Sequence, residues 1–246
     1  MIVSSHQKGW KIITQRSHGL LAAMIAYQYS INLPVEIMMP TLLAIAEHDD
    51  GVNETLADRN LTDAGAPRNF IVTDDNNKTD LEPMLNLMEI SSSKSELNGL
   101  LTSLHVKFLY DSPKRKKDKA LDTFLKAQEK YRTTVLLNLN INKKYADRLY
   151  RFLEWCDAFS LLICLDKIQP EGRKMEISKS PDGDMNTVHF KDNKDICVEP
   201  WPFKEVSFNV FYEYKIVEQL QFKSIEEFNE ICKLTKVERE IFTFCK

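Results

Sequence analysis

Glycine is scarce in this chain, at only 7 of 246 residues. This is roughly half the usual frequency of about 7%, and it disfavours turn-rich all-β architectures and glycine-rich phosphate-binding loops. Charge of one sign is not in excess either, because 33 Lys and Arg face 36 Asp and Glu. We therefore expect a helix-dominated globular protein that binds neither nucleic acid nor a membrane. The sequence leaves its oligomeric state open.

Long apolar runs are missing too. No run approaches the roughly 18 residues that cross a bilayer, and no charged-then-apolar leader opens the chain. The five cysteines include no Cys-x-x-Cys pair and mostly have apolar neighbours. They are typical of buried free thiols in a reducing compartment. The expected location is the cytoplasm.

Apolar residues at helical spacing dominate the chain as far as residue 168. The periodicity predicts helices at residues 15–31, 35–47, 80–110, 120–138 and 143–168, with Pro40 as a kink and an interruption near Ser91. Residues 52–79 are rich in Asp, Asn, Gly and Thr and are expected to form a long loop. The basic run at residues 114–117 is typical of a solvated helix start.

From residue 169 onwards, short runs alternate with turn signals. They predict strands at 175–179, 187–190, 196–199, 206–217 and 237–244, with a short helix after the capping box at Ser224. The expected fold class is mainly α with a C-terminal α+β part, a helical bundle followed by a small antiparallel sheet. Residues 1–168 would form the helical domain, and 169–246 a β-rich subdomain packed on it.

Four residues carry the strongest chemical signal. His18 lies in a predicted helix, and His48 with Asp49 ends the next one. Asp157 lies in the most apolar helix, where a carboxylate without a cation or hydrogen-bond donor costs several kcal/mol. Imidazoles and carboxylates together suit a divalent Fe, Mn, Zn or Ni ion with coordination positions left for water. These residues therefore predict a metal site.

Simpler interpretations exist for each of these residues. His18 could be a core histidine with Gln15 one turn earlier on the same face, and residues 48–50 could be a solvated helix end. Asp157 could pair with Arg148 or Arg151. Asp166 competes with Asp157 as the late ligand.

Three further residues are candidates for catalysis. His105, in an apolar helix, could contact an anionic substrate, act as a general acid or bind a second ion. Asp50 could orient a ligand or act as a base. Arg68, in the predicted loop, could meet a phosphate group. His6 and His189 are expected to be peripheral.

The order His18, His48-Asp49, Asp157 resembles the HD superfamily of metal-dependent phosphohydrolases, over about residues 10–168. Nearly the whole chain is also similar to an uncharacterised bacterial family of unknown function with an HD-like helical core; the residues that carry this similarity are Gly9-Trp10, Gln15, His18-Gly19, Leu21-Ala22, His48-Asp49, Gly51, Gly65, Pro67, His105 and Trp201-Pro202-Phe203. The resemblance implies a metal-dependent hydrolase of a small anionic phosphoester. The alternatives are a non-catalytic HD-like ligand-binding or regulatory module, and a purely structural helical protein.

Overall fold

A computed structural model describes residues 1–51, 60–70, 81–110, 118–191 and 194–246. The basic run at 114–117 lies outside these residues, and so does most of the loop expected at 52–79. None of the helices in the described ranges is both long enough and apolar enough to pass through a membrane.

The framework is a mixed sheet of seven strands in the order β1-β2-β6-β7-β5-β4-β3. β5 and β7 run parallel to each other, and the other neighbouring pairs are antiparallel. In chain order the strands are β1 (Ile2–His6), β2 (Gly9–Ile13), β3 (Met175–Lys179), β4 (Met185–Phe190), β5 (Ile196–Glu199), β6 (Ser207–Val217) and β7 (Val237–Cys245). The sheet therefore joins the two ends of the sequence.

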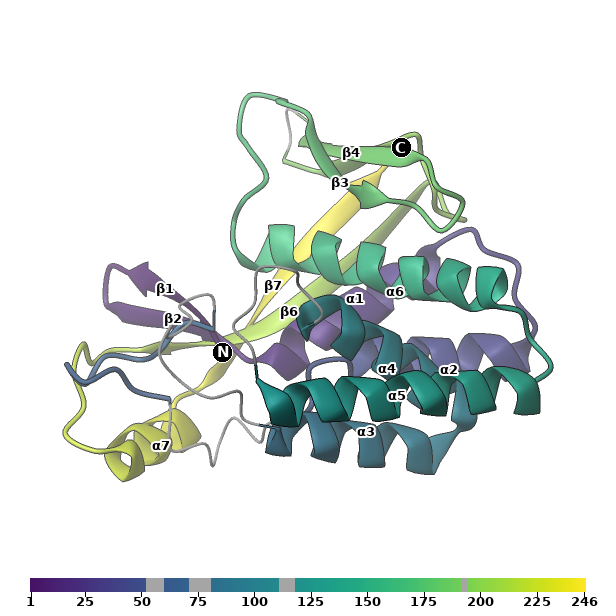
Figure 1. The fold of residues 1–246 in the computed structure, drawn as a ribbon. Helices are drawn as coiled ribbons and strands as arrows, with labels where there is room; N and C mark the ends of the chain where they lie inside the picture. Colours follow the sequence, from purple (N-terminus) through teal and green to yellow (C-terminus); the bar gives the residue numbers. More distant parts are fainter. Residues whose placement is uncertain (52–59, 71–80, 111–117, 192–193) are drawn as a thin grey trace.

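The helices lie beside this sheet, some in contact with it and the others packed on those helices (Figure 1). They are α1 (Gln15–Gln28), α2 (Val35–Ala46), α3 (Glu82–Lys94), α4 (Glu96–Tyr110), α5 (Lys119–Asn138), α6 (Lys143–Cys164) and α7 (Ile225–Leu234). One hydrophobic core includes Leu21 of α1, Phe152 and Trp155 of α6, and Val210 and Phe244 of the sheet. Helices α1 and α6 are thus held against the sheet by one hydrophobic core.

The expected fold class is wrong. The protein has a mixed α/β fold, not a helical bundle followed by a small sheet, because β1 and β2 belong to the same sheet as the C-terminal strands. β2 pairs with β6, with Trp10 opposite Val217. Periodicity within a segment reports which face is apolar, and it carries no information on a pairing partner so distant in the sequence. The sequence therefore did not predict the hairpin of β1 and β2, and the sheet is larger than expected.

A glycine brings the first two helices into close contact. A Cβ atom on Gly19 would lie 2.3 Å from the carbonyl oxygen of Ala46, the last residue of α2. Real Cβ atoms do not approach an oxygen so closely, so only glycine permits this contact. The contact sets His18, the residue before Gly19, beside His48, which follows the end of α2.

Candidate metal centre

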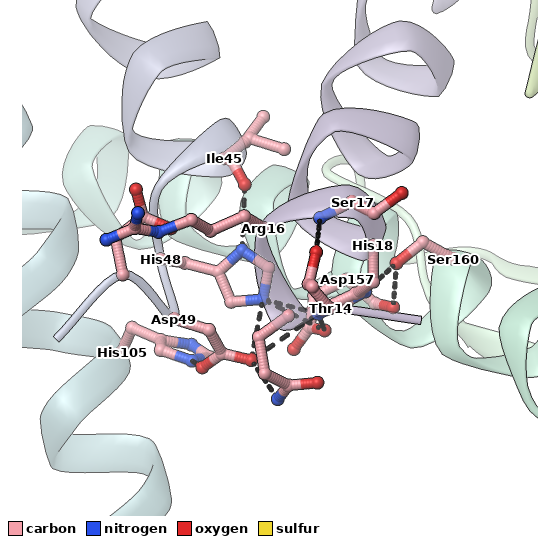
Figure 2. A network of polar contacts seen from close by, with 12 residues as sticks. Thr14, Arg16, Ser17, His18, Ile45, His48, Asp49, His105, Asp157 and Ser160 are labelled. Carbon is pink, nitrogen blue, oxygen red and sulfur yellow. Dashed lines mark hydrogen bonds and ion pairs between the residues drawn. The ribbon is translucent and has the colours of Figure 1, made fainter. Parts of the chain in front are cut away.

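Three helices bring the four predicted ligands together (Figure 2). His18 comes from α1, His48 and Asp49 directly follow α2, and Asp157 comes from α6. The Nε2 atoms of His18 and His48 are 3.1 Å apart. Oδ1 of Asp157 lies 3.2 Å from Nε2 of His48 and 3.5 Å from Nε2 of His18. Oδ2 of Asp49 lies 3.4 Å from Nε2 of His18 and 3.6 Å from Nε2 of His48.

These separations are those of atoms around a single ion. A tetrahedral site with ligands about 2.0–2.2 Å from the metal has ligand atoms about 3.3–3.6 Å apart. An octahedral site brings neighbouring ligand atoms to about 3 Å. The atoms of His18, His48 and Asp157 therefore need little rearrangement to bind a divalent ion, and Oδ2 of Asp49 lies near both ring nitrogens.

Hydrogen bonds at the far side of each ring fix the imidazoles for metal binding. Nδ1 of His48 lies 2.7 Å from the carbonyl oxygen of Ile45, which can only accept, so this nitrogen carries the hydrogen. Nδ1 of His18 lies 2.6 Å from Oγ of Ser160, whose hydroxyl donates to the carbonyl oxygen of Asp157. The hydroxyl of Ser160 therefore accepts from His18. If both rings were neutral, their two Nε2 lone pairs would face each other at 3.1 Å, so either one of these nitrogens holds a proton or both bind a metal ion.

The pKa values of His48, Asp49 and Asp157 are shifted in the directions that favour a positive charge within the cluster. Burial lowers the pKa of His48, but the carboxylates of Asp49 and Asp157 outweigh burial and raise it to about 10. Burial raises the pKa of Asp49 and of Asp157, but the nearby histidines His48, His18 and His105 together outweigh it and lower both. Without a metal the cluster therefore holds a proton on imidazole, and a metal ion would compete with that proton.

Asp157 gives an independent test of whether a metal fits. Its Oδ1 atom is buried and has no hydrogen-bond partner within the described parts of the chain. The two arginines considered as partners contact other groups, since Arg148 pairs with Asp182 and Arg151 donates to the carbonyl oxygen of Pro181. A cation bound by His18 and His48, or the proton that His48 holds without a metal, would neutralise this oxygen, because a buried carboxylate oxygen is otherwise costly.

His105 lies on the other side of Asp49. Its side chain is buried, with Nε2 3.9 Å from Oδ1 of Asp49 and Nδ1 3.5 Å from the hydroxyl of Tyr150. Ligand atoms of His48, Asp49 and His105 lie within 4.8 Å of one another. This second group shares two residues with the first. His105 is therefore placed either to extend the metal site or to exchange a proton beside it.

The remaining candidates lie elsewhere. Asp50 forms an ion pair with Arg16, Oδ1 to Nε at 3.6 Å, and burial raises its pKa against the effect of this arginine. Arg68 lies in a segment held along β1, where the amide of Asn69 donates to the carbonyl oxygen of Val3. Asp166 follows the end of α6, about 13 Å along the helix axis from Asp157. The catalytic roles of Asp50 and Arg68 stay predictions.

A cavity of about 320 Å³ adjoins the cluster. Gln15, His48 and Asp49 line it on one side, and apolar side chains of α3 and α4, among them Met84, Leu87 and Val106, line it together with Met1, Asn60 and Phe70. The amide of Gln15 donates to Oδ2 of Asp49 at 2.9 Å and so holds this ligand in place. The side chain of Asp49 is 25% exposed, against 0% for His18 and 1% for His48.

Two residues that contact the site histidines were not predicted from the sequence. Ser160 orients His18, and Tyr150 contacts His105. Both lie on α6, Ser160 three residues and Tyr150 seven residues from Asp157, so once a metal ligand is placed on that helix, polar residues one or two turns away are worth testing. Gln15 was considered only as a partner of His18, but it binds Asp49 instead.

Replacing Ser160 with alanine is expected to lower metal affinity about 10–100-fold. The substitution removes the acceptor for Nδ1 of His18, so the ring is free to place its hydrogen on Nε2, where the metal would bind. Isothermal titration with Zn²⁺ or Mn²⁺ measures the change. Ser91→Ala is the matched control, because Ser91 is an equally buried serine of α3. Equal affinities for Ser160→Ala and Ser91→Ala would show that Ser160 has no positioning role.

Comparison with known proteins places the chain in a family. No curated protein and no solved structure matches it. A family model described as "Protein of unknown function" matches residues 1–219, which include all four predicted ligands and His105. Nothing in this match links the chain to the HD superfamily. The chain belongs to the DUF3891 family.

Proposed function

We propose that this protein is a metal-dependent hydrolase of a phosphoester, with His18, His48, Asp49 and Asp157 holding a divalent ion. The observation that carries the proposal is the set of four ligand atoms, separated by 3.1–3.6 Å in the pairs measured. The order of these residues along the chain is that of the HD phosphohydrolases, and it favours this reaction over other metal chemistry. Two nitrogen and two oxygen donors suit Fe, Mn, Zn or Ni.

The surrounding residues suit hydrolysis. A divalent ion with four protein ligands and open positions supplies a water molecule of lowered pKa and a positive charge for a phosphoryl oxygen. Gln15 holds Asp49 through a hydrogen bond, and Ser160 keeps the lone pair of His18 directed into the site. His105 lies beside Asp49 within reach of the same space, so we assign it proton transfer to the leaving group.

The cavity indicates what kind of phosphoester would fit. Asp49 is the most exposed of the four ligands and also lines the cavity, so this is the approach by which substrate would reach the ion. At about 320 Å³ the cavity is at the small end of the range for ligand pockets. Its walls of Met84, Leu87 and Val106 favour an apolar group beside the phosphate. We therefore propose a small phosphoester with a compact apolar substituent.

The test is a hydrolysis assay on the full-length protein with p-nitrophenyl phosphate, which combines a phosphoester with one aromatic ring. Protein loaded with Mn²⁺, Fe²⁺, Zn²⁺ or Ni²⁺ is expected to release p-nitrophenol. Chelation should abolish the activity, and adding the metal back should restore it. Bound metal without turnover of this ester or of other small phosphoesters would contradict the proposal and support a ligand-binding or regulatory module instead.

A further inference from the structure

A second group of metal-binding side chains lies on the sheet, on elements that the first site does not use. His189 of β4 is directly opposite Cys197 of β5, and Glu199 lies two residues further along β5 on the same face. One nitrogen, the sulfur and one carboxylate oxygen of these residues all lie within 4.8 Å of one another. An imidazole, a thiol and a carboxylate therefore meet at one point on the sheet surface.

Alternation along the strands explains why these residues meet. Val188, Ile196 and Val198 are fully buried in the core and alternate with His189 and Cys197. Successive residues of a strand point to opposite faces, so the polar group lies on the face turned away from the core. Directly opposite residues of an antiparallel pair have Cβ atoms about 4.5–5.5 Å apart, within bridging distance of a metal ion.

A neighbouring strand adds a second thiol. Ile196 of β5 is paired with Phe244 of the parallel strand β7. The residues that follow them, Cys197 and Cys245, are therefore neighbours on the same face of the sheet. Cys245 contacts the side chain of Lys191 and is partly exposed. A second thiol thus lies beside Cys197, on the side of β5 away from His189.

The polar atoms of this group have few hydrogen-bond partners among the residues that the structure describes. Nδ1 of His189 is buried and finds no hydrogen-bond partner among the residues that the structure describes. Its Nε2 atom lies 4.0 Å from Oε1 of Glu199, beyond hydrogen-bonding distance. Cys197 is a free thiol with 6% of its surface exposed. A buried ring nitrogen and a buried thiol side by side are the donors that a transition metal would engage.

We propose that His189, Cys197 and Glu199 form a second metal site, selective for Zn²⁺ or a similar thiophilic divalent ion. Binding would form a metal–sulfur bond as the thiol of Cys197 releases its proton to solvent. Tetrahedral zinc with nitrogen and sulfur ligands places these atoms about 3.6 Å apart, so the group must close by at most about 1 Å. Glu199, which is 47% exposed, can supply that movement by rotating.

One existing contact competes with the metal. Lys174 forms an ion pair with Glu199, but both side chains are about half exposed. Exposed ion pairs contribute little stability and are screened by salt, so a divalent ion can displace Lys174 from this carboxylate. The other two ligands would not have to give up any such partner.

Cobalt substitution tests the proposal, because Co²⁺ bound by a thiolate absorbs strongly in the near ultraviolet and Co²⁺ bound only by histidine and carboxylate does not. Full-length protein titrated with Co²⁺ is expected to develop this band. Cys197→Ser should lose the band and about one equivalent of metal, and Glu199→Gln should weaken binding at least about tenfold. His48→Ala should keep the band, since it alters only the first site.

Cys232→Ser is the matched control, because Cys232 is a partly exposed thiol on α7 and should leave the band unchanged. Absence of the band in the wild-type protein would overturn the proposal. So would a band that survives in Cys197→Ser or disappears in Cys232→Ser. Circular dichroism of each variant establishes that it has folded, and Glu199→Gln changes an exposed side chain whose loss the fold tolerates.

Discussion

Replacing His48 with alanine is expected to abolish metal binding at the histidine–aspartate site and phosphoester hydrolysis together. The substitution removes one of four ligands and leaves the carboxylates of Asp49 and Asp157 near each other without the positive charge that His48 or a metal supplies. Loss of a residue that only orients a ligand costs about 10–100-fold in affinity, so loss of a ligand should exceed about 100-fold. Elemental analysis and kcat/KM measure the two effects.

The experiment is cleanest in a Cys197→Ser background, where a metal at the sheet site cannot contribute to the count. His6→Ala is the matched control, since His6 is an exposed histidine of β1. Asp49→Asn provides a second variant that preserves shape while weakening the ligand, in case His48→Ala does not fold. Metal content and activity that persist in both His48→Ala and Asp49→Asn would refute the assignment of the site.

Removing the metal is expected to lower the unfolding temperature substantially. Ligands on α1, after α2 and on α6 come together only in the folded chain, so an ion stabilises the folded state by about 4 kcal/mol at a concentration 1,000 times Kd. For a chain of this size that corresponds to a shift of about 8–16 °C. Thermal unfolding with saturating metal and with a chelator measures the difference.

Both proteins are compared in the Cys197→Ser background, and there His48→Ala gives the reference, because its unfolding temperature should be nearly the same with metal and with chelator. If the wild-type protein binds about one equivalent of metal at this site and its unfolding temperature does not change, then the ligands do not depend on the fold for their arrangement. That result would contradict the geometry in which three separate helices each contribute to the site.

The helices could be predicted from the sequence because their signals are local. The periodicity over 143–168 corresponds to α6 (Lys143–Cys164), and the capping box at Ser224 starts α7, where its hydroxyl accepts from the backbone N–H of Glu227. Pro40 does not break α2, which runs on to Ala46 although a proline at this position cannot donate a hydrogen bond to the carbonyl oxygen of Glu36. Ser95 separates α3 from α4, close to the predicted interruption.

The sheet was harder to predict because its order depends on contacts between distant segments. The strands from residue 175 onwards were recognised by their turns, but the hairpin of β1 and β2 was not. Its pairing with β6 joins residues about 200 positions apart. Nothing within residues 2–13 specifies that partner, so the C-terminal segment could only be expected to form a sheet of its own.

The candidate site was easier to predict than the fold around it. A histidine or aspartate in an apolar helix conflicts with its surroundings, and such a conflict is visible without knowing the topology. His18 and Asp157 were found in this way. Ser160 was not, because a serine in a helix causes no conflict and its importance comes only from the ring of His18 beside it. The sequence therefore shows which residues are unusual but not which residues support them.

The turn of α6 that contains Asp157 and Ser160 contributes to the candidate metal centre in two ways. The side chain of Asp157 is a proposed ligand. The backbone carbonyl of the same residue accepts a hydrogen bond from the hydroxyl of Ser160, which in turn sets the hydrogen position on His18. If this turn unwinds, the site loses a ligand and the correct form of a second ligand in a single event. Metal occupancy would therefore be all-or-none with respect to this turn, and a bound ion would report that α6 is intact.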